Sequence, residues 1–278
     1  MSNFLKLFNF EWNRFIKLYI ILFGLVFIVQ MIGLSYLIYD YKAMINLEIG
    51  KNHMSTEQFV DMYGMFGIDH LSISILFIAP IGISVAALLF YVPFIWYRDW
   101  FARNTFIYRL FMLPTSRMNL LFAKLATIIV GVLSIVAYQL ILLVLYKGII
   151  SWTIPTAFRN DVSVLEMVME SSYLSIVLPG GVMEFLVAYG LGTMFVIIIF
   201  TAILMERSFR WLGAFLGALY IPAMAIIFYA PLIIIELFYT SFPLYANELF
   251  YVFLVMWIII TVGSLLLSRY LLNRKVTV

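Results

Sequence analysis

The sequence predicts an all-α integral membrane protein that crosses the bilayer six times. Of its 278 residues, 65% are apolar and only 11% are charged, whereas about 25% are charged in a typical soluble domain. The mean hydropathy is +1.08, and a water-soluble fold cannot hide that much apolar surface. The composition therefore excludes a soluble enzyme, a nucleic-acid-binding domain and a disordered chain.

Six long apolar runs predict the individual spans. A helix needs about 20 apolar residues, at 1.5 Å each, to cross the hydrocarbon core. Such runs occur at 18–38, 71–97, 125–146, 183–205, 211–229 and 250–267. Pro80 and Pro93 interrupt the second run, Pro231 follows the fifth, and the third helix is expected to start near Ser116. We expect residues 1–278 to form a single transmembrane domain in which the first run is retained as a span.

The basic residues predict the orientation, because cytoplasmic loops of membrane proteins are enriched in Lys and Arg. With the N-terminus inside, 13 basic residues lie on the inner side and four on the outer side. The inner ones are Lys6, Arg14, Lys17, Arg98, Arg103, Arg109, Arg117, Lys124, Arg207, Arg210, Arg269, Arg274 and Lys275, and the outer ones are Lys42, Lys51, Lys147 and Arg159. Both termini are therefore predicted to be cytoplasmic. The chain itself is expected in the plasma membrane of the cell.

Four segments lie outside the predicted spans. Residues 1–17 mix aromatic and basic side chains, which is typical of an amphipathic helix in the membrane interface. Residues 39–70 include a capping-box pattern at Ser55 and Gln58, and 147–181 include a helix-like stretch before a break at 178–181. Residues 231–248 are apolar but short, and we expect an outer or re-entrant hairpin there.

Several kinds of chemistry are missing from the chain. It contains no Cys, no H-E-x-x-H pattern and no G-x-x-x-x-G-K-[ST] nucleotide-binding loop. No Ser is accompanied by an intramembrane His, so an intramembrane serine protease is not expected. The residues therefore predict neither an enzyme nor a bound cofactor or metal in this chain.

Few polar residues interrupt the apolar runs. Glu236 is the one candidate for a buried coupling carboxylate. A continuous helix from Trp211 would place it beyond the core, at the outer interface, whereas a bend at Pro231 would give it a deeper position. Gln30, Gln139, Thr193 and Thr201 are candidates either for a translocation surface or for interhelical hydrogen bonds. Gly213 and Gly217 form a GxxxG motif, which favours close helix packing without proving dimerisation.

The segment 98–117 carries the most specific signal. Its basic residues are interleaved with aromatic ones, which favours a short helix lying at the inner interface with Asp99 as its cap. Arg117 is expected in the first turn of the next helix, where the helix dipole disfavours a cation by about 0.3–1 kcal/mol. A lipid phosphate or a protein carboxylate is expected to offset that cost.

This segment resembles the inner loop of ABC exporter permeases of the six-span class. The family pattern is Gly-Thr, then Leu-Pro-hydroxyl-Ser-Arg, then Gly-Lys at the opening of the third span. The matching residues here are Asn104-Thr105, Leu113-Pro114-Thr115-Ser116-Arg117 and Ala123-Lys124, with Asn104 and Ala123 where the family has glycine. The six-span layout and the interfacial N-terminal helix extend the resemblance over the whole chain.

The resemblance implies a permease that pairs with a second identical or paralogous permease and binds two cytoplasmic ATPase subunits. Those subunits would bind ATP and Mg²⁺. By position, the residues that couple to the ATPase would be Arg98, Asp99, Arg103, Arg109 and Arg117. The expected function is ATP-driven export of an apolar or amphipathic cargo, such as a peptide, an antimicrobial, a lipid-like molecule or a drug.

Two alternatives stay open. One is a secondary transporter that uses Glu236, and the other is a non-transport membrane scaffold that recruits cytoplasmic partners through its basic loop. The expected partners are then membrane lipids and other proteins, not nucleic acid.

Overall fold

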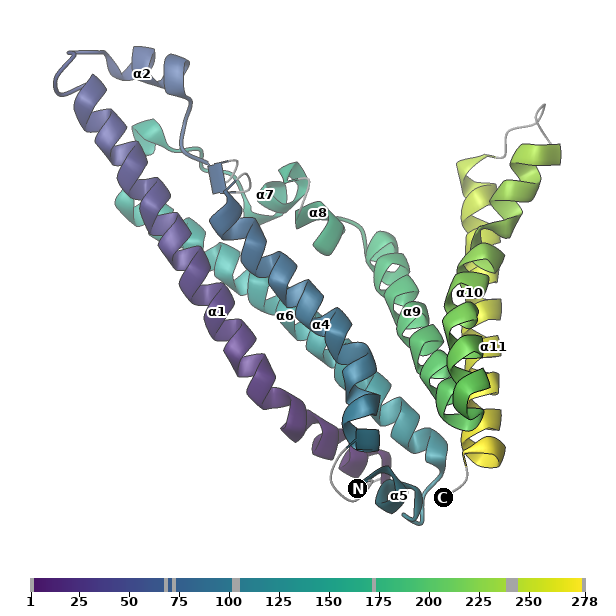
Figure 1. Ribbon diagram of the computed structural model, residues 1–278. Coiled ribbons are helices and arrows are strands. Elements are labelled where there is room, and N and C mark those ends of the chain that lie inside the picture. Colours follow the sequence, from purple (N-terminus) through teal and green to yellow (C-terminus); the bar gives the residue numbers. More distant parts are fainter. Residues whose placement is uncertain are drawn as a thin grey trace. The chain divides into compact units, whose positions relative to one another are not determined.

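In the residues that it describes, the computed structural model contains helices and one isolated bridge, between Phe66 and Arg159, but no extended strand (Figure 1). It describes residues 3–67, 70–71, 74–101, 106–171, 174–238 and 245–276. Within these residues, six helices are long and apolar enough to cross a membrane. The prediction of an all-α protein with six candidate spans is therefore confirmed, and it marks the chain as a multi-pass membrane protein.

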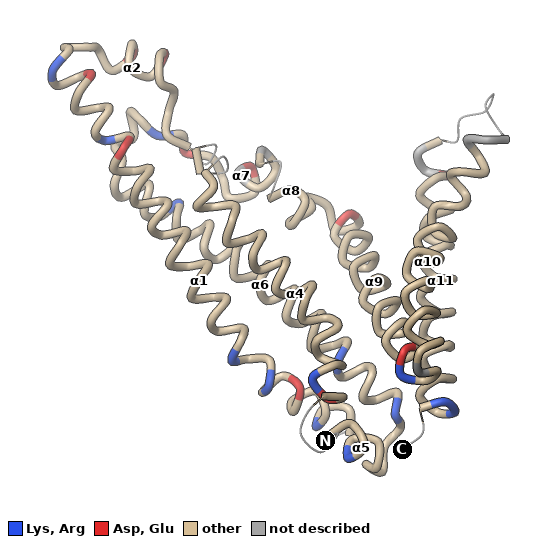
Figure 2. Tube along the Cα trace, viewed as in Figure 1, with Lys and Arg blue, Asp and Glu red and all other residues tan. Residues whose placement is uncertain are grey.

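The six long helices are α1 Asn3–Glu48, α4 Ile75–Phe101, α6 Arg117–Thr153, α9 Val182–Ser208, α10 Arg210–Phe238 and α11 Ala246–Tyr270, which continues as a π-helical turn η2 Leu271–Lys275. Five of the six are longer than their apolar runs, and α4 has the same length as its run but is shifted toward the C-terminus. Figure 2 shows charged residues near the helix ends and long uncharged stretches between them. The additional turns therefore carry most of the charge, as expected where a helix leaves the hydrocarbon core.

The chain folds into two compact units. The first comprises residues 1–13, 89–129 and 187–278, and the second comprises 14–88 and 130–186. Helices α1, α4, α6 and α9 each contribute to both units. In the first unit, α9, α10 and α11 share an apolar core built around Met194, Ile198, Phe228 and Ile260.

Helix α1 differs from the expectation of a separate interfacial helix before the first span. It is one helix of 46 residues from Asn3 to Glu48. Residues 3–17 contain neither Gly nor Pro, so nothing in that stretch ends a helix. The amphipathic N-terminal segment is therefore the first part of α1.

Helix α4 is also continuous, and the predicted interruption at Pro80 and Pro93 is absent. Each proline removes only the one helical bond that its missing N–H would donate, and membrane helices tolerate such a loss when the neighbouring turns are intact. Ser84 Oγ also donates to Pro80 O at 2.8 Å near the start of the helix. The expectation that Asp99 caps a new helix is wrong, because α4 continues to Phe101. The short helix α5 follows at Phe106–Phe111.

The two segments that were predicted to lie on the outer side, 39–70 and 147–181, meet in the second unit. Helix α2, Thr56–Tyr63, begins with the predicted capping box between Ser55 and Gln58. Phe66 N donates to Phe158 O at 2.8 Å, and Tyr41 Oη donates to Gly64 O at 2.9 Å and to Phe158 O at 3.1 Å. The second segment contains η1 Thr156–Phe158, α7 Val164–Glu170 and α8 Leu174–Val177, and the predicted break at 178–181 separates α8 from α9.

The segment 231–248, expected to be a hairpin of its own, belongs mostly to two long helices. Helix α10 passes through Pro231 and ends at Phe238, and α11 begins at Ala246. Residues 239–244 lie outside the described part of the chain. One proline removes one backbone donor, which does not break a helix whose remaining turns are intact.

Candidate functional site

Four charged side chains from three helices form a buried ion cluster in the first unit. They are Glu11 of α1, Arg98 and Asp99 of α4, and Lys124 of α6. Lys124 Nζ donates to Glu11 Oε1 at 2.6 Å, to Ile95 O at 3.0 Å and to Asp99 Oδ2. The side chains of Glu11, Asp99 and Lys124 are fully buried. Lys124 therefore joins the N-terminal segment of α1 to the end of α4.

Arg98 completes the cluster from its more exposed edge. Its Nη2 donates to Glu11 Oε2 at 2.6 Å, and its Nη1 donates to Tyr91 Oη at 3.0 Å. Two cations therefore face two carboxylates, and the cluster is neutral. The Lys124 ammonium also lies 5.2 Å from the ring centroid of Trp96, which is buried against Phe200. Because each carboxylate is paired with a cation, these charged side chains can remain buried.

Sequence reasoning identified only half of this cluster. Arg98 and Asp99 were expected to contact a partner protein, whereas the structure turns both toward α1 and α6. Lys124 was expected only as an inner-side charge and as the last residue of the family pattern, and Glu11 was assigned no role. One signal was available, because Glu11 is the single acidic residue among the first 39 residues, and a lone carboxylate among basic residues and aromatics indicates an internal partner.

In the sequence, helix α5 lies between the end of α4 and the beginning of α6. Both of these helices contribute side chains to the ion cluster. Its Ile107 and Phe111 are buried, whereas Arg109 is exposed. Trp100 of α4 packs edge-on against Phe111, with ring centroids 6.2 Å apart. Arg109 is thus presented on a short helix that is anchored on its apolar side. Arg103, the remaining predicted coupling residue in this stretch, lies outside the described residues.

Arg117 finds a different partner from the one expected. Its Nη1 donates to the carbonyl oxygens of Leu272 and, at 2.9 Å, Val276, and its guanidinium lies 4.9 Å from the ring centroid of Phe111. Carbonyls at the end of a helix carry partial negative charge and lack helical partners. They therefore take the place of the lipid phosphate or carboxylate that we expected, and they tie the start of α6 to the C-terminal turn η2.

Gln30 and Gln139 form an interhelical pair in the second unit. Gln30 Nε2 donates to Phe77 O at 3.1 Å and to Gln139 Oε1 at 3.4 Å, and Tyr146 Oη donates to Gln30 Oε1 at 2.9 Å. All three side chains are buried. This geometry joins α1, α4 and α6 by hydrogen bonds. It agrees with the interhelical role considered for Gln30 and Gln139, and a role in translocation stays a prediction.

The two threonines of α9 also bond within the protein. Thr193 Oγ1 donates to Tyr189 O at 2.8 Å, one turn earlier in the same helix. Thr201 Oγ1 lies 2.9 Å from Ser268 Oγ and 3.2 Å from Ser264 O, while Ser264 Oγ lies 2.8 Å from Tyr220 Oη. Thr201 therefore belongs to a buried hydroxyl network that links α9, α10 and α11, and a role in translocation stays a prediction.

Gly213 and Gly217 lie where α10 passes closely over the end of α9. A methyl group added at Gly217 would lie 2.6 Å from Ala202 O, and one at Gly213 would lie 2.3 Å from Met205 O. Both distances are far below van der Waals contact, so only glycine allows this approach. The motif therefore packs two helices of the same chain against each other.

Glu236 lies in the last turn of α10, just beyond the apolar stretch Trp211–Ile235. Because α10 is continuous through Pro231, the backbone at Glu236 is about 38 Å from Trp211 at 1.5 Å per residue. This agrees with a position outside the hydrocarbon core, which is roughly 30 Å thick.

Comparisons of the chain with models of protein families, with characterised proteins and with solved structures find no match.

Proposed function

We propose that this chain is the membrane-spanning permease subunit of an ABC exporter of the six-span class. The observation that carries the proposal is the inner-loop sequence from Asn104 to Lys124, which resembles that family and joins the second candidate span to the third. The absence of a nucleotide-binding loop from the sequence agrees with a subunit whose energy comes from a separate ATPase. A second permease copy or paralogue and two ATPase subunits complete the proposed assembly.

The arrangement around α5 supports a coupling role for this loop. A partner that presses on Arg109 would act on a short helix whose flanking helices meet at Lys124. Because the buried ion pairs link α1, α4 and α6, such a push would move these segments together. Rigid transmission of this kind is what a two-state transition between inward-facing and outward-facing forms requires.

The spans favour an apolar or amphipathic cargo. No Asp, Glu, Lys or Arg occurs within 18–38, 71–97, 125–146, 185–205, 211–235 or 249–268. An ionic cargo or a coupling ion would require charged or ionisable groups near the midplane. A peptide, an antimicrobial, a lipid-like molecule or a drug fits these spans better.

Co-purification of an ATPase tests the proposal. The protein would be isolated from its native membranes in mild detergent as wild type, Arg109→Glu and Arg274→Glu, and the accompanying chains would be identified by mass. Arg274 is also exposed and basic but lies in the C-terminal turn. We expect a P-loop ATPase with the wild type and with Arg274→Glu, and its loss from Arg109→Glu, because charge reversal removes a favourable contact and adds a repulsive one.

Other outcomes separate the competing functions. Absence of an ATPase from correctly folded wild-type protein would contradict the permease proposal. Transport driven by a pH gradient without ATP, and abolished by Glu236→Gln, would favour a secondary transporter. Stable capture of a cytoplasmic partner that lacks ATPase activity would favour a scaffold.

A further inference from the structure

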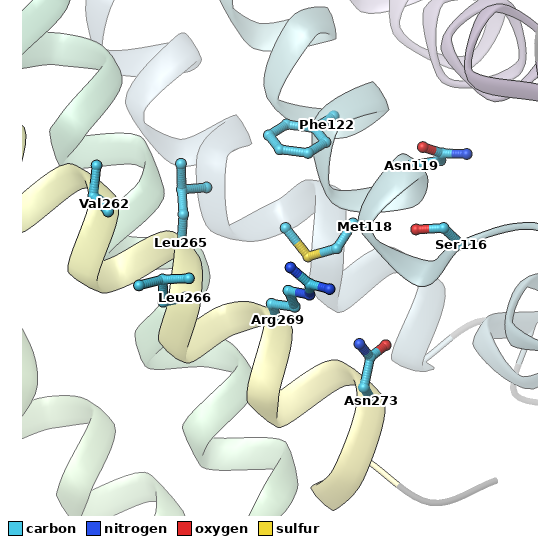
Figure 3. A pocket seen from close by; sticks show the side chains of 9 residues that line it. All are labelled: Ser116, Met118, Asn119, Phe122, Val262, Leu265, Leu266, Arg269 and Asn273. Atoms are coloured by element: carbon cyan, nitrogen blue, oxygen red, sulfur yellow. The ribbon is translucent and has the colours of Figure 1, made fainter.

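A groove in the first unit runs between the beginning of α6 and the end of α11 (Figure 3). Its volume is about 530 Å³, within the range of about 300–1,000 Å³ that is usual for small-molecule sites. The lining residues are Ser116, Met118, Asn119, Phe122, Val262, Leu265, Leu266, Arg269 and Asn273. None of them belongs to the ion cluster or to helix α5.

One end of the groove is polar and positively charged. Arg269 and Asn273 point their donors toward it, Asn119 turns its amide oxygen to this side, and the Ser116 hydroxyl lies nearby. Among the described residues, the structure gives the side chain of Arg269 no hydrogen bond or ion pair, whereas Arg98, Arg117 and Arg159 are bonded within the protein. No acidic side chain lines the groove. This end therefore offers the unused guanidinium of Arg269 and the amide donor of Asn273 to an anion.

The other end of the groove is apolar. Phe122, Val262 and Leu266 line it and are all partly exposed to the surroundings, with 39%, 49% and 59% of their surface accessible. Val262 precedes Arg269 by about two helical turns, or roughly 10 Å along α11. A small soluble anion would leave this apolar wall uncovered, whereas a ligand with an attached hydrocarbon chain would cover it.

The position of the groove agrees with such a ligand. Arg269 lies in the last turn of α11, and Ser116 directly precedes α6, so the polar end falls where both helices reach the predicted cytoplasmic interface. The apolar end lies further along both helices, toward the hydrocarbon core. Acidic phospholipids of the inner leaflet place a phosphate and an acyl chain in this same order.

The groove is also held in shape. Arg117 of α6 bonds the carbonyls of Leu272 and Val276, immediately beyond the groove at the end of α11. The two walls are therefore connected at the polar end without using Arg269. Because the site is already formed, ligand binding costs less free energy for ordering its walls.

We infer that this groove binds one acidic phospholipid, with its phosphate at Arg269 and Asn273 and an acyl chain along Phe122, Val262 and Leu266. The inference does not depend on the proposed exporter function. Lipid binding here would add a second link between α6 and α11, besides the bonds that Arg117 makes to Leu272 O and Val276 O.

Native mass spectrometry of the detergent-purified protein tests this inference. Phosphatidylglycerol and phosphatidylcholine would be titrated onto wild type, Arg269→Gln and Arg274→Gln. We expect wild type to prefer phosphatidylglycerol, and Arg269→Gln to bind it roughly tenfold more weakly, because one charge-assisted contact is lost. Arg274→Gln removes an equal charge just outside the groove and is expected to bind as wild type does.

A second pair of variants tests the apolar wall. Leu266→Trp partly fills the groove, and we expect it to weaken phosphatidylglycerol binding without changing the net charge. Leu219→Trp, at an exposed position of α10, is its matched control.

Equal loss of phosphatidylglycerol binding in Arg269→Gln and Arg274→Gln would show that binding depends on overall charge alone, and it would overturn the inference. Displacement by glycerol phosphate as effective as by the lipid would show a soluble-phosphate site instead.

Discussion

At the scale of single residues, Lys124 is the centre of the described charge network. It contacts two carboxylates and one backbone carbonyl, and the carboxylates come from positions 113 and 25 residues away in the sequence. Burial removes hydration from all of these groups, so each charge depends on its partners. A residue of this kind contributes to stability chiefly because its removal takes a cation away from two buried carboxylates.

We predict that Lys124→Met lowers the free energy of unfolding by about 3–5 kcal/mol, because Glu11 and Asp99 then lose their shared cation. The double variant Asp99→Asn/Lys124→Met restores neutrality, with Glu11 still paired to Arg98, and should recover part of the loss. The apparent melting temperature in detergent, followed by size-exclusion chromatography, measures both effects. Lys17→Met, at an exposed position, is the control and should melt as wild type does. A double variant no more stable than Lys124→Met would contradict the pairing argument.

At the scale of elements, the α9–α10 hairpin depends on backbone contact. Only Phe209 separates the two helices, and both glycines of the GxxxG motif face carbonyl oxygens of α9. Without a hydrophobic driving force between helices in lipid, such close approach provides the packing energy. The same motif is often associated with dimers, but here its smooth face is occupied within the chain.

We predict that Gly217→Ala destabilises the protein by about 1–3 kcal/mol, because its methyl group would overlap Ala202 O. Gly192→Ala and Gly263→Ala are matched controls, since an added methyl group meets nothing within 4 Å at either position. Thermal unfolding would rank the three variants, and native mass spectrometry would report their oligomeric state. A Gly217→Ala variant of normal stability that no longer dimerises would assign the motif to an intermolecular contact.

At the scale of the whole molecule, the exposed apolar surface requires a membrane. In the most apolar stretches of α10 and α11, only 6% and 11% of the residues are buried within the protein. Water would not tolerate helices exposed in this way, whereas lipid or another apolar subunit covers them without cost. The distribution of Lys and Arg then predicts which ends face the cytoplasm.

We predict that residue 51 is outside the cell and residue 274 is inside. The chain has no Cys, so Lys51→Cys and Arg274→Cys each provide one reactive thiol at an exposed position. A membrane-impermeant maleimide should label Lys51→Cys in intact cells, but Arg274→Cys only after permeabilisation. The reverse pattern would invert the topology and would place α5 on the outer side, which no cytoplasmic ATPase could reach.

The sequence was sufficient to predict the spans but not their lengths or partners. Hydropathy detects the part of a helix that lies in hydrocarbon, so it located the run 18–38 but missed the further turns that extend α1 to 46 residues. The capping box at Ser55 was predictable because it depends on neighbouring residues alone. The cluster of Glu11 with Arg98 and Lys124 was not, because contacts 87 and 113 residues apart are set by helix packing.

We propose that energy enters this protein through the loop around α5 from a partner ATPase. The most direct measurement is ATP hydrolysis by the co-purified complex in lipid nanodiscs, compared among wild type, Arg109→Glu and Arg274→Glu. We predict hydrolysis with wild type and Arg274→Glu, and a loss of at least roughly tenfold with Arg109→Glu, because charge reversal weakens the contact by more than about 1.4 kcal/mol. Hydrolysis that is unchanged by Arg109→Glu, or a folded wild-type complex without any ATPase, would contradict the account.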